Sequence, residues 1–141
     1  MNLDGQILKG EHQPTKEVNM HIGIFKIRRD VNSIIHYHPP WTTAFASRGL
    51  KIPLITLHSK RILHDVPLLP LLEEGSAELA KSITNHFKNS DVKAITLTNH
   101  GLVAVGSSIQ EAENIAELIE ETAKIAWISN LIDKDKFTKL H

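Results

Sequence analysis

The 141-residue sequence contains no cysteine, which excludes disulfide bonds, thiolate nucleophiles and cysteine-ligated zinc. Any metal site must therefore use nitrogen and oxygen ligands. Sixteen basic residues balance sixteen acidic ones, so no overall charge draws the chain to nucleic acid or to an anionic membrane. No apolar run is long enough to span a membrane, and no signal-peptide pattern opens the chain. We expect a cytoplasmic protein whose partner is a small molecule or another protein.

Aromatic residues are also scarce, at 5%, whereas histidines number nine and are the first candidates for function. His36 and His38 end the β-forming run "SIIHYH", directly before two prolines. Alternate side chains of a strand share one face, with Cα atoms about 6.6 Å apart, so both imidazoles can reach one metal ion. The prolines end the strand, at the kind of edge where sites open in α/β sheets. The alternative is a buried, hydrogen-bonded histidine beside an exposed one.

Apolar periodicity, capping residues and turn residues predict a single α/β domain over residues 1–141, with helices around a small sheet. The expected helices cover residues 16–30, 41–49 and 77–89, and a long final helix follows them. Thr15 is expected to cap the first of these helices and Ser76 the third, while Ser108 and Glu111 form a capping box for the last. The expected strands cover residues 31–38 and 52–57 and two runs within 91–106 that are separated at 99–101. Residues 61–75 are expected to form a surface loop, and residues 133–141 a frayed end.

Two more residues are candidates for the same site. His100 stands between Asn99 and Gly101, where glycine lets the backbone turn tightly and approach a ligand, so it is a possible third nitrogen. The alternative is an ordinary surface histidine. Glu17 falls in the first turn of a helix predicted to be buried, with His21 one turn later on the same face. The alternative for Glu17 is a carboxylate that bonds the free amides at the helix start.

Three segments resemble the class II aldolase/adducin family, typified by L-fuculose-phosphate aldolase and L-ribulose-phosphate epimerase. They read "PTKEVNMHIGIFKIRRDVNSIIHYHPP", "GSAELAKSI" and "ITLTNHGLVAVGSSIQEAENIAELIEETAKIA". The elements P-[ST]-x-E, H-x-H-P and N-H-G follow one another in the family's order and at its intervals. The resemblance implies a three-layer fold with a small, mainly antiparallel sheet that is reduced at the N-terminus. It also implies that His36, His38 and His100 bind zinc and that Glu17 is the acid/base group.

Three nitrogen ligands and an open fourth position are typical of catalytic zinc, although another divalent transition metal would also suit them. The resemblance implies a lyase or epimerase that acts on a small sugar, a hydroxyketone or a sugar phosphate through a zinc-stabilised enediolate. Glu17 would move the proton, and His21 is considered as a residue that orients it. The alternative is a non-catalytic metal-binding or assembly module of the adducin type, or a fragment that needs a partner chain.

The sequence departs from the family pattern in two places. Family members carry a longer segment ahead of "LDG", which includes the loops that hold the substrate phosphate, so we expect those loops to be absent here. The aldolases have a tyrosine after the second "IP" strand, where this chain reads "IPLITLHSK"; His58 or His64 is considered as a substitute, against a surface role for both. An open sheet edge and the apolar "VPLLPLL" loop predict a homo-oligomer, and the family favours a tetramer.

Overall fold

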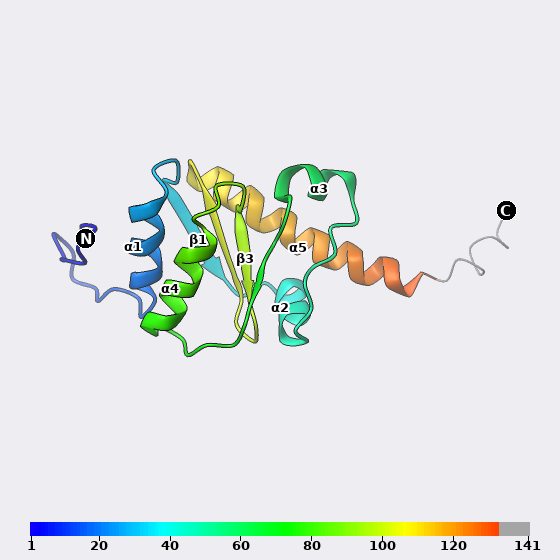
Figure 1. The fold of residues 1–141 in the computed structure, drawn as a ribbon, viewed down its shortest axis with the longest axis horizontal. Helices are drawn as coiled ribbons and strands as arrows, with labels where there is room; N and C mark the ends of the chain where they lie inside the picture. The colour runs from blue at the N-terminus through cyan, green and yellow to red at the C-terminus, as the bar shows by residue number, and fades with distance from the viewer. Residues whose placement is uncertain (133–141) are drawn as a thin grey trace, which may run out of the picture.

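The computed structural model describes residues 1–132, and the end predicted to fray, residues 133–141, lies outside this range. Its elements are α1 (Val18–Ile27), β1 (Ser33–Tyr37), α2 (Pro40–Ser47), α3 (Leu57–Leu63), β2 (Leu68–Leu69), α4 (Ala77–His86), β3 (Ala94–Leu97), β4 (Leu102–Gly106) and α5 (Ile109–Leu131). The strands form a sheet in the order β1-β4-β3-β2, in which β2 and β3 are parallel and the other pairs antiparallel (Figure 1). The predicted α/β class with a small, mainly antiparallel sheet is confirmed.

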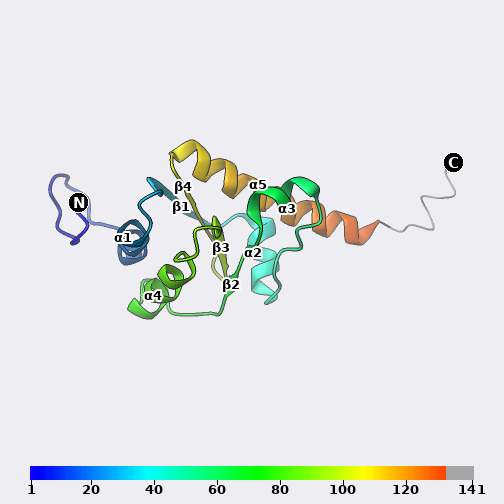
Figure 2. The same ribbon diagram turned by 45° about the horizontal axis from the view of Figure 1, so that its top comes forward.

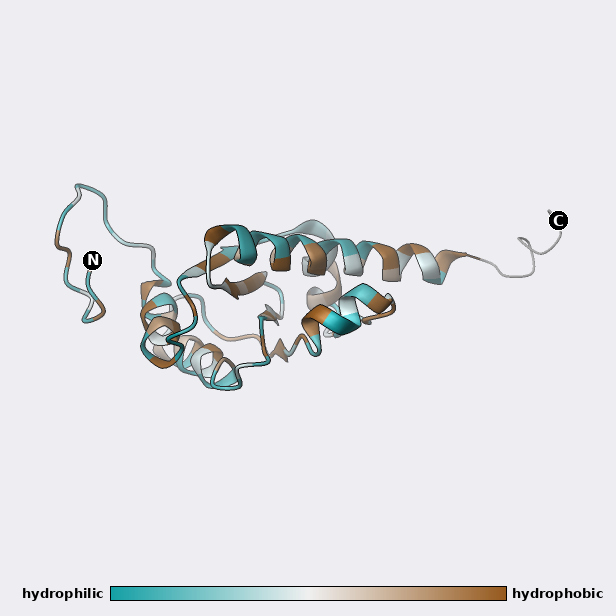
Figure 3. Cartoon of the chain, turned by 90° about the horizontal axis from the view of Figure 1, so that it is seen from above, coloured by the Kyte–Doolittle hydropathy of each residue, from teal (hydrophilic) through white to brown (hydrophobic). Residues whose placement is uncertain are grey.

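Helices cover both faces of this sheet, as expected for three layers (Figure 2). Side chains alternate along β3 and β4: Ile95 and Val103 pack with α1 and α4, whereas Ala94 and Ala104 pack against α5. The central strands are mostly apolar (Figure 3) and fully buried, because both of their faces are covered. Burial of apolar surface on two sides, at about 25 cal/mol per Å², is the main force that holds the layers together.

Two of the predicted caps are present. The hydroxyl of Ser76 accepts the N–H of Leu79 at 3.1 Å, and the hydroxyl of Ser108 accepts the N–H of Glu111 at 3.2 Å. The Glu111 carboxylate reaches back to the N–H of Ser107 rather than to that of Ser108. Both helices therefore begin where the sequence predicts.

The first helix is shorter than predicted and has a different start. Glu17 is the residue before its first turn, and the Thr15 hydroxyl accepts the N–H of Glu17 at 3.3 Å instead of capping the helix. Arg28 is extended, so the helix ends there and not at residue 30. Of the two apolar rows that were expected to be buried, only Met20 and Ile24 are fully enclosed.

The strand predicted over residues 52–57 is wrong. Residues 51–55 are irregular, and Pro53 lacks the N–H that a ladder needs. The hydroxyl of Thr56 then accepts the N–H of Ser59 at 3.1 Å and starts α3. The loop predicted over residues 61–75 is therefore wrong in part, because α3 runs into it and β2 lies within it. Val66 and Leu69 of "VPLLPLL" are core residues, and Leu71 is exposed.

The last helix follows its predicted stripe over most of its length. Its Ala112, Ile115, Ile119, Ala123 and Ala126 are buried, but Trp127 is 48% exposed because the end of α5 extends past the sheet (Figure 1). No helix within residues 1–132 is both long and apolar enough to cross a membrane.

A buried arginine connects α1 to the segment after α4. Arg28 is 7% exposed and makes two hydrogen bonds to the carboxylate of Asp30, at 2.8 and 2.6 Å. Its Nη1 also lies 3.2–3.4 Å from the carbonyl oxygens of Phe87, Asn89 and Val92. One guanidinium thus provides a hydrogen-bond donor for three backbone carbonyls of the turn that leads into β3.

Substitution Arg28→Met should lower the free energy of unfolding by about 2–4 kcal/mol, because it leaves these carbonyls without their donor. Urea denaturation measures the change. Arg29→Met is the matched control, since Arg29 is adjacent and exposed, and its effect should stay within about 0.5 kcal/mol. Equal losses in the two variants would contradict the bridging role of Arg28.

Candidate metal centre

The site forms where the end of β1 meets the start of β4. Tyr37 pairs with Leu102 in the antiparallel register, which places His36 and His38 beside the turn that carries His100. Gly101 allows this approach: a Cβ atom there would lie 2.5 Å from the carbonyl oxygen of Tyr37 and 2.7 Å from the His38 ring. Any other residue would push the strand ends apart.

The turn between β3 and β4 presents His100 to that meeting point. Asn99 has a φ of 56°, a left-handed conformation that asparagine tolerates better than most residues. The N–H of His100 donates to the carbonyl of Leu97 at 3.0 Å, and the N–H of Leu97 donates to that of Gly101 at 2.8 Å. The N-H-G sequence is thus a closed, hydrogen-bonded turn.

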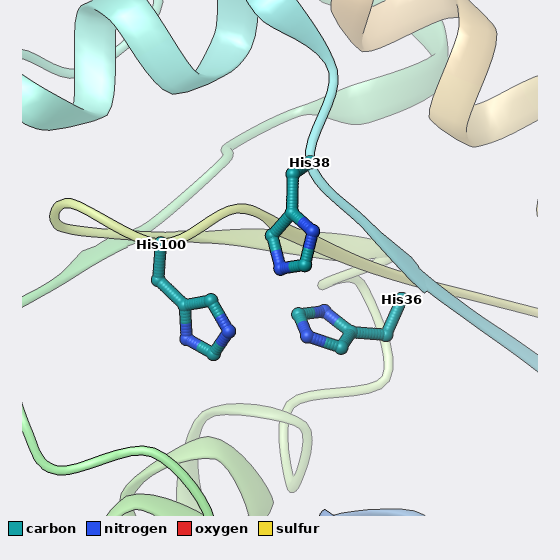
Figure 4. Close-up of side chains that lie close together, drawn as sticks. All are labelled: His36, His38 and His100. Carbon is teal, nitrogen blue, oxygen red and sulfur yellow. The ribbon is translucent and has the colours of Figure 1, made fainter.

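The three imidazoles that the sequence singled out converge in one space, pointing toward one another from the end of β1, the residue after it and the turn (Figure 4). Their ring centroids lie 4.9–5.2 Å apart. One ring nitrogen from each of His36, His38 and His100 lies within 4.8 Å of the others, close enough to hold one metal ion. His38 is exposed, and the other two are partly buried, so the site is open on one side.

The protonation of the rings suits metal binding. His36 Nδ1 lies 2.9 Å from the carbonyl oxygen of Leu102, so we assign its proton to Nδ1 and leave Nε2 free. Burial lowers the pKa of His100 and outweighs the opposing attraction of Glu17, so this ring is neutral at neutral pH. Both rings therefore offer lone pairs.

Glu17 lies against this cluster from α1. It is 8% exposed, and its Oε2 lies 2.7 Å from His36 Nε2, while its Oε1 lies 3.8 Å from His100 Nε2. The 2.7 Å contact joins two acceptors, because the His36 proton is assigned to Nδ1, so the Nε2 atoms of both histidines and Glu17 Oε1 have no hydrogen-bond partner. Buried lone pairs without donors are costly unless a cation lies among them, so these residues fit a metal ion. The carboxylate forms no capping bond to the helix, contrary to the alternative role considered for it.

Sequence reasoning missed a residue that supports the end of β1. The carboxylate of Glu120, on α5, accepts the N–H groups of Trp41 and Thr42 at 2.9 and 2.8 Å. These are free amides at the start of α2, two and three residues after the proline that follows His38. The bond therefore fixes the chain directly behind the H-x-H pair. No local pattern in the sequence reveals it, since the partners are 78 and 79 residues apart.

Of four other residues, Glu74 and His21 lie near the cluster, whereas His58 and His64 do not belong to it. Glu74, which sequence reasoning also missed, places its Oε1 3.8 Å from His100 Nε2. Burial lowers the pKa of His21, and the nearby His36 lowers it further. The role of His21 in orienting Glu17 stays a prediction. Among the ligand groups found within residues 1–132, neither His58 nor His64 takes part; both are exposed.

Known proteins resemble this chain over most of its length. Residues 1–127 match the model of the class II aldolase and adducin N-terminal domain. An L-fuculose phosphate aldolase of Methanococcus maripaludis is 33% identical over 92% of this chain and 68% of its own. A 3-oxo-tetronate 4-phosphate decarboxylase of Escherichia coli K12 is 34% identical over 89% of this chain and 60% of its own. The crystal structure of YgbL from Klebsiella pneumoniae superposes with a TM-score of 0.84 and 28% identity, over 99% of this chain and 70% of YgbL.

The chain thus spans between 60% and 70% of the length of these relatives. The match includes the whole sheet, α1 and most of α5, and with them every residue of the candidate centre. The sequence match, the shared fold and the converging histidines lead to one conclusion: the chain belongs to the class II aldolase and adducin family.

Proposed function

We propose that this chain is a zinc-dependent carbon–carbon lyase that acts on a small sugar or hydroxyketone, with the phosphorylated forms among its candidate substrates. The observation that carries the proposal is the convergence of three imidazoles beside a buried carboxylate whose Oε1 has no hydrogen-bond partner. Three nitrogen ligands with an open side are typical of catalytic rather than structural zinc.

Zinc bound by His36, His38 and His100 would supply Lewis acidity, which stabilises negative charge on a substrate oxygen beside the bond that breaks. Glu17 would hold or release a proton at the same position, and its Oε1, which has no hydrogen-bond partner, supports this role. The bond from His36 Nδ1 to the Leu102 carbonyl fixes the His36 ring for binding through Nε2.

The relatives support the reaction class. An aldolase cleaves a carbon–carbon bond near a carbonyl group, and a decarboxylase breaks a similar bond with carbon dioxide as the leaving group. Both kinds of enzyme occur among proteins 33–34% identical to this chain. Each of these relatives acts on a phosphorylated compound, as its name states, so sugar phosphates are tested beside the free sugars.

The first expected outcome concerns the metal. One zinc ion should bind per chain, and alanine at His36, His38 or His100 should weaken binding by about 100-fold or more, beyond the loss typical of an outer-shell partner. Elemental analysis and competition with a chelating dye measure this. His12→Ala, at an exposed position in the N-terminal segment, is the control and should bind as the parent does. Full occupancy in all three alanine variants would refute the site.

The second expected outcome concerns proton transfer. Glu17→Gln should retain zinc but lose about 10²–10⁴-fold of its catalysis, because an amide cannot take the proton. Exchange of the carbon-bound hydrogens of dihydroxyacetone and of its phosphate in D₂O, followed by NMR, detects this step without knowledge of the full substrate. Glu11→Gln serves as the control at an exposed carboxylate. Zinc-loaded protein with no exchange on either compound, and no cleavage of fuculose 1-phosphate, would favour the non-catalytic metal-binding module.

The third expected outcome is assembly. We propose that the chain forms a homo-oligomer, with a tetramer favoured, in the cytoplasm. Trp127, Ile128 and Leu131 are 48%, 44% and 65% exposed at the end of α5, and Leu50 is 54% exposed beside it, which makes an apolar surface for another copy. Light scattering at micromolar concentration measures the mass. A stable monomer would contradict the proposal.

A further inference from the structure

A second carboxylate approaches the metal centre from outside. Glu74 lies in the loop between β2 and α4, and its Oε1 is 3.8 Å from His100 Nε2. One oxygen from each of Glu17 and Glu74 and one nitrogen of His100 lie within 4.8 Å of one another. His100 therefore belongs to two ligand groups: one with the other histidines, and one with two carboxylates.

The atoms between these carboxylates lack partners. Glu17 is more than nine-tenths buried, and neither its Oε1 nor His100 Nε2 has a hydrogen-bond partner. Glu17 Oε1 and Glu74 Oε1 each lie 3.8 Å from His100 Nε2. Two carboxylates close to the lone pair of one imidazole nitrogen favour the binding of a cation.

The loop that carries Glu74 is held close to Glu17. Gly75 has a φ of 73°, and a Cβ atom at this position would lie 3.2 Å from the Cβ and carbonyl oxygen of Lys16. Lys16 immediately precedes Glu17, so the backbone of the loop packs on the backbone that carries the buried carboxylate. The side chain of Glu74 is 61% exposed and can turn toward the centre or away from it.

We infer that Glu74 supplies a carboxylate oxygen to the metal ion held by His36, His38 and His100. This inference rests on the metal centre of the proposed function. Glu74 would then be a ligand on the solvent side of the ion, where a substrate must arrive. An oxygen of the substrate would therefore replace the Glu74 carboxylate on the ion. A carboxylate on a loop suits such exchange better than a buried ligand.

The test compares Glu74→Gln with Glu73→Gln. Both remove one negative charge from the same exposed loop, but only Glu74 has an atom near His100. Affinity for Co²⁺ is measured by competition with a chelating dye at low and at high salt. Salt screens the effect of a distant charge but not of a direct ligand. The visible absorption of bound Co²⁺ reports a change in its ligands and does not depend on activity.

Glu74→Gln should weaken Co²⁺ binding by about tenfold or more at both salt concentrations and change the absorption band, whereas Glu73→Gln should stay within about twofold. An affinity within twofold of Glu73→Gln and an unchanged spectrum would overturn the inference. His38→Ala separates the two claims. If that variant loses the metal while Glu74→Gln does not, the inference fails and the three-histidine centre stands; if His38→Ala keeps the metal, the centre itself fails.

Discussion

The pairing of Tyr37 with Leu102 is the constraint on which the candidate centre depends. It joins an edge strand to the middle of the sheet at the point where all three histidines gather. The approach is close enough that Gly101 has no room for a side chain. Because β3 and β4 are buried on both faces, the register cannot slip without moving apolar side chains to the wrong layer. The geometry of the ligands is therefore set by the core strands together with the hydrogen-bonded turn that carries His100.

The unfavourable electrostatics of the centre have a reason in this arrangement. Glu17 and two imidazole nitrogens are buried without donors, which costs free energy in the metal-free protein. Burial also keeps the pKa of His100 low, so protonation of this ring does not relieve the cost at neutral pH. A bound metal ion would relieve it, and the fold and the ion would then stabilise each other.

Local patterns predicted much of the fold, and long-range contacts explain what they missed. Ser76 and Ser108 cap the helices expected of them because a cap needs only residues three apart. The run "IPLITL" has strand-like composition, yet Pro53 and the cap at Thr56 direct it into a loop and a helix. The spacing of His36 and His38 indicated a shared ligand pair, and the turn at His100 a third. Glu74 and Glu120 act across the fold, so no spacing in the sequence indicated them.

Two of the three histidines are only two residues apart, and this proximity survives when the chain unfolds. If the proposed centre binds a metal ion, the unfolded protein keeps a two-nitrogen chelate at His36 and His38, while His100 and Glu17 separate from it. Metal then stabilises the native state only by the ratio of its affinities for the folded centre and for this residual pair. At high metal concentration both states are saturated, and the melting temperature stops rising. The plateau measures how much the folded positions of Glu17 and His100 add to the binding of the ion.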